Sequence, residues 1–435
     1  MDLANLKASF SKYFLLDQKL QDGKLAVKDV ANDASFYQRH RRICSFLIPA
    51  FIVWILWWPY MATESAFDLF VGTTGSFQAP RWYTSLTMVF GATVAGATSE
   101  GGAAIAFPVL TLTMGVAPGI ARDFSYLIQS CGMTAAAFSI WFMGIKCEWN
   151  SILWCSIGGL VGLVFGLEYV APALTPAFNK MYFVCIWLAF AVSLYWINRL
   201  SGVRKVDAIE GWASDKNVVW KHEDSSVSLN KNAMVLTAFG ILGGIFTSMS
   251  GSGLDICSFA VLTLLYRVDE RVATPTSVIL MAINTVLAYI YRMGVMGDFN
   301  QEAYNLFLVC APIVCIMAPV GAVIATHFHS SVLAGLIYIV DVVQFIGALV
   351  IIKPWLHKDA GGKTDEPGLL CWTSALLLFG GAFFFTLLAR YGVHILADEA
   401  EVKEAEKVLD VDVEMEIPES HDVLQTQAIA IEQKN

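Results

Sequence analysis

The sequence predicts an all-α integral membrane protein built from two inverted-topology repeats, each a re-entrant or broken helical hairpin followed by three transmembrane helices, with one extra helix at each end. Three observations predict this fold: long uncharged apolar runs, an internal repeat at an offset of 152 residues, and a Gly/Ser-rich interruption near the start of each repeat. Hydrophobic residues make up 56% of the 435 positions and charged residues only 15%, which is outside the range of soluble proteins.

The apolar runs have the length of membrane spans. Runs of about 18 to 25 apolar residues match the roughly 30 Å hydrocarbon core at 1.5 Å per helical residue. We expect a first span at 43–61 and a last span at 368–389. Between them, the expected continuous spans are 123–145, 151–170, 181–200, 272–293, 303–326 and 331–352.

Polar segments lie at both ends of the chain and in one internal loop. Basic residues in the polar segment 1–42, next to the first span, place the N-terminus in the cytoplasm by the positive-inside rule, and the basic loop 201–231 should lie there too. Residues 398–435 contain twelve acidic and three basic residues, a charge of −9 that equals the net charge of the whole chain. We expect the acidic tail 390–435 to be disordered and cytoplasmic.

The internal repeat relates residues 83–200 to residues 232–352. Phe107 to Leu112 share the pattern Phe-x-Val-Leu-Thr-Leu with Phe259 to Leu264, and the loop Glu148-Trp149-Asn150 matches Asp298-Phe299-Asn300. A hairpin does not cross the bilayer, so each copy makes three net crossings. The second copy should therefore be upside down relative to the first, as in alternating-access transporters.

Each repeat opens with an apolar stretch that small residues interrupt. Glycine lets a ligand approach the backbone, and the N-termini of half-helices attract anions. The alternative is that these residues only allow close helix packing. The candidate substrate-binding residues are Thr98, Ser99, Gly101, Gly102, Ser250, Gly251, Ser252 and Gly253.

Charged residues within or beside the spans are candidates for further roles. Glu100 and Asp255 occupy the two interruptions and Asp341 lies inside a span, so we expect proton or cation coupling there. The alternative for the first two is a structural role beside the Gly-rich backbone. Arg122 and Arg271, near the starts of equivalent spans, are candidates for attracting an anion, with interfacial anchoring as the alternative.

The motifs around both interruptions follow one pattern: a Gly-rich break, then an apolar helix, then Ala-x-x-x-Ser at the start of a span. The first copy has Gly101-Gly102, Pro108-Val109-Leu110 and Ala121 to Ser125. The second copy has Gly251-Ser252-Gly253, Val261-Leu262 and Ala273 to Ser277. Over residues 85–352 the chain thus resembles the TauE/SafE family of sulfite and organosulfur anion transporters. The resemblance implies movement of sulfite, sulfonates or related small anions.

We therefore expect a secondary transporter, an exporter of a small anion, that works by alternating access with proton coupling in the lipid bilayer. No P-loop and no hydrolase motif occurs, which argues against an ATP-driven pump and against an enzyme. The nine cysteines form no zinc spacing, and we expect no metal, no cofactor and no nucleic acid partner. The alternatives are an anion channel, or a non-transporting receptor or scaffold acting through the acidic tail. The substrate, direction, membrane and oligomeric state stay open.

Overall fold

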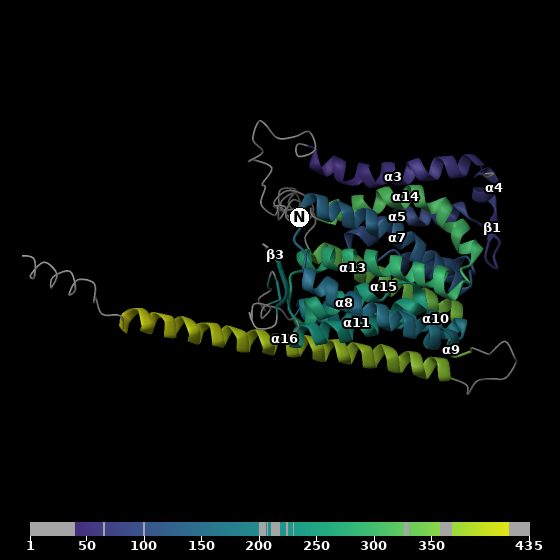
Figure 1. Cartoon of the computed structure of the whole chain (residues 1–435). Helices are drawn as coiled ribbons and strands as arrows, with labels where there is room; N and C mark the ends of the chain where they lie inside the picture. The colour runs from purple at the N-terminus through teal and green to yellow at the C-terminus, as the bar shows by residue number, and fades with distance from the viewer. Residues whose placement is uncertain are drawn as a thin grey trace, which may run out of the picture.

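The computed structural model describes residues 40–63, 66–98, 101–199, 206, 208–209, 218–222, 225–228, 230–325, 330–356 and 368–416. The long helices pack side by side in one bundle (Figure 1). Within these residues, nine helices are long and apolar enough to cross a membrane. The prediction of an all-α, multi-pass integral membrane protein is confirmed.

The described residues of the first half form eight α-helices before the internal loop, together with two π-helical segments and one small β-hairpin. Its elements are α3 (Arg41–Thr63), α4 (Ala66–Val71), β1 (Thr73–Thr74), β2 (Ala79–Pro80), α5 (Trp82–Ala97), α6 (Ala103–Pro108), η2 (Val109–Thr113), α7 (Pro118–Met143), α8 (Trp149–Phe165), η3 (Gly166–Val170), α9 (Ala171–Ala173) and α10 (Pro176–Arg199).

The second half begins with a β-hairpin inside the predicted loop 201–231 and repeats the pattern of a broken hairpin and long helices. Its elements are β3 (Val218–His222), β4 (Ser225–Ser228), α11 (Lys231–Ser250), α12 (Leu254–Ala260), η5 (Val261–Leu265), α13 (Glu270–Ile290), η6 (Tyr291–Met296), α14 (Gln301–Ala325), α15 (Ser330–Ile352) and α16 (Leu369–Glu416).

Local signals explain several helix boundaries. The Asn230 side chain accepts a hydrogen bond from Ala233 N (3.1 Å) and so caps the first turn of α11. Asp269 caps α13 in the same way, through Arg271 N (2.9 Å). At the other end of a helix, α7 stops at Gly144, whose φ of +68° is the left-handed conformation that glycine adopts without strain.

The first broken hairpin consists of α5 and the return arm α6–η2, and it begins and ends at the β1 end of the bundle (Figure 1). Ser76 N, in the turn between β1 and β2, donates to Gly115 O (3.2 Å), just beyond the return arm. The arm from 103 to 113 is about 16 Å long at 1.5 Å per residue, roughly half of the bilayer core. The hairpin therefore enters the bundle without crossing it.

The second broken hairpin consists of α11 and the return arm α12–η5, and it opens at the opposite end, where β3 lies (Figure 1). Val206 N donates to Arg267 O (3.0 Å), and Asp269 N donates to Val206 O (2.9 Å), just beyond the return arm. By length α11 alone could cross a membrane, but the chain reverses at Gly251 and Gly253, whose φ values are +89° and +155°.

Glycines let the first arm of each hairpin approach a long helix of the other half. A Cβ on Gly96 of α5 would collide with the carbonyl of Ala318 in α14, and one on Gly321 of α14 would collide with the carbonyl of Thr93. The same holds for α11 and α8, since a Cβ on Gly244 would collide with the carbonyl of Gly159. Small residues at helix contacts are typical of membrane proteins.

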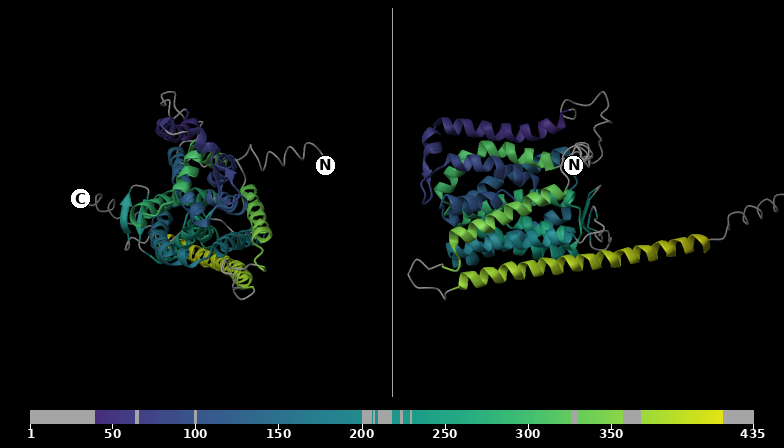
Figure 2. Two further views of the ribbon diagram at one scale, coloured as in Figure 1. Left: turned by 90° about the vertical axis from the view of Figure 1, so that its right-hand side faces the viewer. Right: turned by 180° about the vertical axis from the view of Figure 1, so that it is seen from behind.

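The last helix differs from the expectation. The predicted span ends at 389 and a disordered tail was expected from 390, but α16 continues to Glu416 and runs past the end of the bundle (Figure 2). The sequence from 396 to 409 is rich in Leu, Ala, Glu and Lys, which favour helix, and has no proline to stop it. Residues 1–39, 417–435 and most of the loop 201–231 lie outside the described residues.

Candidate functional site

The two interruptions meet inside the bundle. Gly101 has a φ of +68°, and a Cβ built on it would lie 2.5 Å from Asp255 Oδ2, 2.6 Å from Gln129 Oε1 and 3.0 Å from Ser252 Oγ. The backbone of the first break thus lies directly against the second break and against α7. Only glycine fits at this position, because of both its conformation and its surroundings.

The carboxylate of Asp255 organises the second break. Ser252 Oγ donates to Asp255 Oδ2 (2.5 Å), while Gly253 N and Ile256 N donate to Oδ1 (2.8 and 3.0 Å). These bonds hold the turn and satisfy backbone donors at the start of α12, which is the structural role considered above. The Oδ2 atom also faces Gly101, so the same carboxylate is part of the meeting point of the two breaks.

Gln129 on α7 is a residue of this site that the sequence reasoning missed. Its Nε2 donates to Gly251 O (2.7 Å) and to Ser125 O (3.1 Å), whereas its Oε1 is buried with no hydrogen-bond partner among the described residues. Gln129 stands inside a predicted span with no motif around it. The available signal was its spacing, one helical turn after Ser125 of the Ala-x-x-x-Ser pattern.

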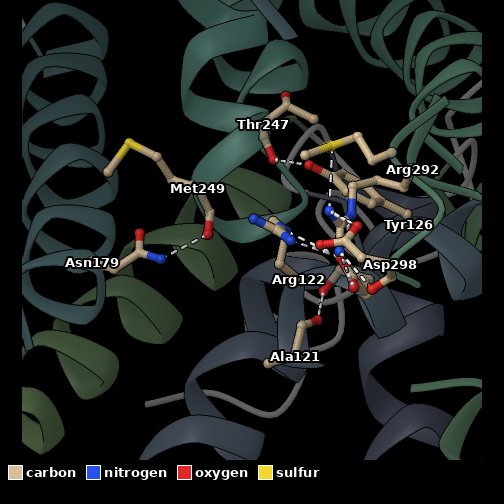
Figure 3. Close-up of polar contacts among 11 residues, drawn as sticks. Ala121, Arg122, Tyr126, Asn179, Thr247, Met249, Arg292 and Asp298 are labelled. Carbon is tan, nitrogen blue, oxygen red and sulfur yellow. Dashed lines mark hydrogen bonds and ion pairs between the residues drawn. The ribbon is translucent and has the colours of Figure 1, made fainter. Parts of the chain in front are cut away.

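Three side chains of the first half hold the carbonyls at the end of α11. Besides Gln129 on Gly251, Tyr126 Oη donates to Thr247 O (2.9 Å), and Asn179 Nδ2 donates to Met249 O (2.9 Å), as Figure 3 shows for these two. The last carbonyls of a helix lack partners within the helix. The second break is therefore supported by α7 and α10 of the first half.

Two hydroxyl groups of the breaks, those of Thr98 and Ser250, donate to backbone carbonyls. Thr98 Oγ1 donates to Val94 O (2.8 Å), and Ser250 Oγ donates to Ser252 O (2.9 Å). The Thr98 and Ser250 side chains are buried, as are Gly101, Gly102, Gly251, Ser252 and Gly253. In this conformation the described residues of both breaks are buried from solvent. Ser99 and Glu100 lie outside the described residues.

A buried cluster of charges lies beside the second break (Figure 3). Arg292 Nη2 and Arg122 Nη2 donate to the two carboxylate oxygens of Asp123, over 2.9 and 3.0 Å. Arg292 Nη1 also pairs with Asp298 Oδ1 (2.5 Å). Asp123 and Arg292 come from different halves of the chain, 169 residues apart. Of the two predicted arginines, Arg122 thus binds a neighbouring carboxylate.

The remaining predicted residues in the described part of the chain are Arg271 and Asp341. Arg271 is exposed in the first turn of α13, at the β3 end of the bundle. Asp341 is buried on α15, with Gln344 less than one turn further along. That helix packs mainly against α10 and also touches the return arm α6–η2. No cluster of three metal-ligating side chains occurs in the described part of the chain.

Comparison with known proteins gives one match. The family model described as sulfite exporter TauE/SafE matches residues 84–347, which include both broken hairpins and the long helices that follow them. Searches of curated proteins and of solved structures found no match. The matched region covers more than half of the chain, and the chain therefore belongs to the TauE/SafE sulfite exporter family, whose members are membrane transporters.

Proposed function

We propose that the protein is a secondary transporter that exports sulfite, a sulfonate or a related small sulfur anion by alternating access. The observation that carries this proposal is the meeting of the two breaks, where Gly101 lies against Asp255 and Ser252, inside the region matched by the sulfite exporter family. Non-helical backbone at membrane depth is tolerated only where protein buries it or where it lines a wet cavity.

The two halves are proposed to be repeats of inverted topology. Two features support this relation: the hairpins open at opposite ends of the bundle, and each first arm packs on a long helix of the other half, α5 on α14 and α11 on α8. Rocking of one half against the other would then open the meeting point to one end at a time. With the N-terminus in the cytoplasm, the β1 end faces outward and α16 ends inside.

The substrate is proposed to bind where the return arms begin. Both α6–η2 and α12–η5 start at the breaks, so their first N–H groups and the positive ends of their dipoles lie there, which suits an anion. The predicted binding residues would line this space once the halves separate: Thr98, Ser99, Gly101, Gly102 and the four from Ser250 to Gly253. Arg122 would draw the anion in from the β1 side.

Proton coupling is proposed at Asp255, because this carboxylate touches both breaks and so senses whether they are together. Glu100 and Asp341 remain proposed coupling residues on sequence grounds. An ionisable group buried at membrane depth is costly and is a functional hypothesis by default.

Flux through reconstituted protein tests the proposal. We expect vesicles that contain the full chain to move labelled sulfite or a taurine-like sulfonate, faster with a pH gradient than without one, and Asp255→Asn to abolish the effect of the gradient. Sulfate serves as a comparison anion. Failure of all these anions to move would contradict the proposed function.

Two further measurements separate the alternative functions. A carrier accelerates exchange of labelled for unlabelled substrate in counterflow, whereas an anion channel only equilibrates it. Deletion of residues 398–435 should leave flux intact in a transporter. Loss of all function after this deletion would favour a receptor or scaffold that acts through the tail.

A further inference from the structure

The oxygen of the Gln129 amide is buried without a hydrogen-bond partner among the described residues, and it lies near the Asp255 carboxylate beside Gly101. The amide is oriented by its nitrogen, because both N–H groups are used on the carbonyls of Ser125 and Gly251. Rotating the amide by 180° would place its oxygen against those two carbonyl oxygens. The unpartnered Oε1 atom therefore points at Gly101 and the second break.

This oxygen shares a small space with the Asp255 carboxylate. Gln129 Oε1 and Asp255 Oδ2 lie 2.6 and 2.5 Å from one point beside Gly101, so the two oxygens are at most 5.1 Å apart (2.6 + 2.5). Both residues are only 1% exposed. An amide oxygen and a carboxylate are both acceptors, and two buried acceptors that face each other without a donor are unfavourable.

The described surroundings of Asp255 supply no positive charge. The Ser252 hydroxyl and the backbone N–H groups of Gly253 and Ile256 donate to it, and no Lys, Arg or His nitrogen of the described residues forms an ion pair with it. Among the described residues, the thiol of Cys257 on the same helix interacts electrostatically with this carboxylate. A proton on the carboxyl group would resolve the conflict.

We propose that a proton carried by Asp255 Oδ2 and donated to Gln129 Oε1 joins the two halves of the protein in the closed conformation. The role of this proton in coupling rests on the proposed transport function, but the binding of the proton does not. Loss of the proton leaves two acceptors facing each other across the breaks, one on α7 and one at the start of α12. Deprotonation therefore favours separation of the breaks, and closure requires the proton.

Two oxygens are enough to hold a proton, whereas a metal cation needs more ligands. The three nearest atoms to the point beside Gly101 are oxygens of Asp255, Gln129 and Ser252, whereas Mg²⁺ and Ca²⁺ in proteins take six or more oxygen ligands. Sodium binding becomes an outcome of the test.

Infrared spectroscopy of the purified full chain in lipid nanodiscs tests the proposal without transport. We expect a pH-dependent carbonyl band of a protonated carboxylic acid that is lost in Asp255→Asn. In Gln129→Leu the band should shift in frequency, since the acid loses its acceptor. The matched control is Asn284→Leu on α13. Asn284 Oδ1 is also buried without a partner, but no carboxylate hydrogen-bonds to this amide. Its Nδ2 donates to Ser156 Oγ and to Leu280 O. This control should leave the band unchanged.

Three results would overturn the proposal. If no carboxylic acid band sensitive to Asp255→Asn appears at any pH at which the chain is folded, no proton is held there. An unchanged band in folded Gln129→Leu, or Na⁺-dependent thermal stabilisation that Asp255→Asn removes, would also contradict it. A band that behaves as expected in a protein that moves no sulfur anion would leave the proton site standing and refute the proposed function instead.

Discussion

Equivalent loops of the two repeats join the halves at the two ends of the bundle, but the contacts differ in charge. At the β1 end, the loop that contains Asp298 is joined to the start of α7 through Arg292 and the Asp123 carboxylate. At the β3 end, the equivalent loop contains Glu148, whose backbone N–H donates to Thr276 Oγ1 (2.9 Å) near the start of α13. One end uses ion pairs, and the other uses a neutral hydrogen bond.

The difference follows from one repeat position. Arg292 corresponds to Phe142 in the first copy, so the first copy has no guanidinium at the position that pairs with the acidic loop residue in the second copy. Glu148 is buried instead, at 7% exposure against 63% for the Asp298 side chain. Burial raises the pKa of the Glu148 carboxyl to about 7, although Ile209 N–H, Lys146 and Asn150 partly oppose the rise. The β3 end is therefore the end that responds to pH near neutrality.

The largest expected effect is at the ion-paired end. Asp123→Ala leaves Arg292 and Arg122 without their shared carboxylate, which should lower the free energy of unfolding by about 3–5 kcal/mol. Asp298→Ala, at the exposed member of the cluster, is the matched control and should cost about 1 kcal/mol or less. Chemical denaturation in detergent measures both. Equal losses in the two variants would show that the buried pair does not hold this end.

The next effect is the pH dependence of the β3 end. The pKa of Glu148 is raised from its ordinary 4.5 to about 7, so its contribution to stability is full below pH 4.5 and is lost as pH rises to about 7. The loss should reach about 3 kcal/mol at most. Glu148→Gln should remove this dependence, as thermal unfolding across that range would reveal. A variant that keeps the wild-type pH profile would exclude Glu148 as its source.

The smallest effect concerns the neutral contact itself. Thr276→Val deletes the acceptor of the buried Glu148 N–H, which should cost about 1–2 kcal/mol in the free energy of unfolding. Thr276→Ser keeps a hydroxyl at the same place and is the control. If both substitutions are equally harmful, packing of the Thr276 methyl group, and not the hydrogen bond, stabilises this end.

The spans were predictable because a membrane-spanning helix is defined by its length and hydropathy. The interruptions were predictable because Gly101, Gly251 and Gly253 stand in Gly/Ser-rich segments that disfavour a continuous helix. What these positions touch was not predictable. The Asp123–Arg292 pair joins residues 169 positions apart, and Gln129 meets Asp255 only once both hairpins are folded. Periodicity describes neighbours along a helix and carries no information on such contacts.

The continuation of α16 was missed for a different reason. Composition alone assigned the acidic segment to solvent, but an acidic segment rich in Glu, Ala, Lys and Leu is also a good helix former when a preceding span nucleates it. Net charge indicates contact with water, and it does not by itself indicate disorder.

The central claim is that transport takes place where the two breaks meet, and sulfite flux through Gly101→Ala and Gly119→Ala tests it most directly. A Cβ on Gly101 meets Asp255, Gln129 and Ser252, whereas one on Gly119 meets nothing within 4 Å. With equal amounts of folded protein in vesicles, we expect Gly101→Ala to lose about tenfold or more of the flux and Gly119→Ala to match the wild type. Wild-type flux in Gly101→Ala would contradict the claim.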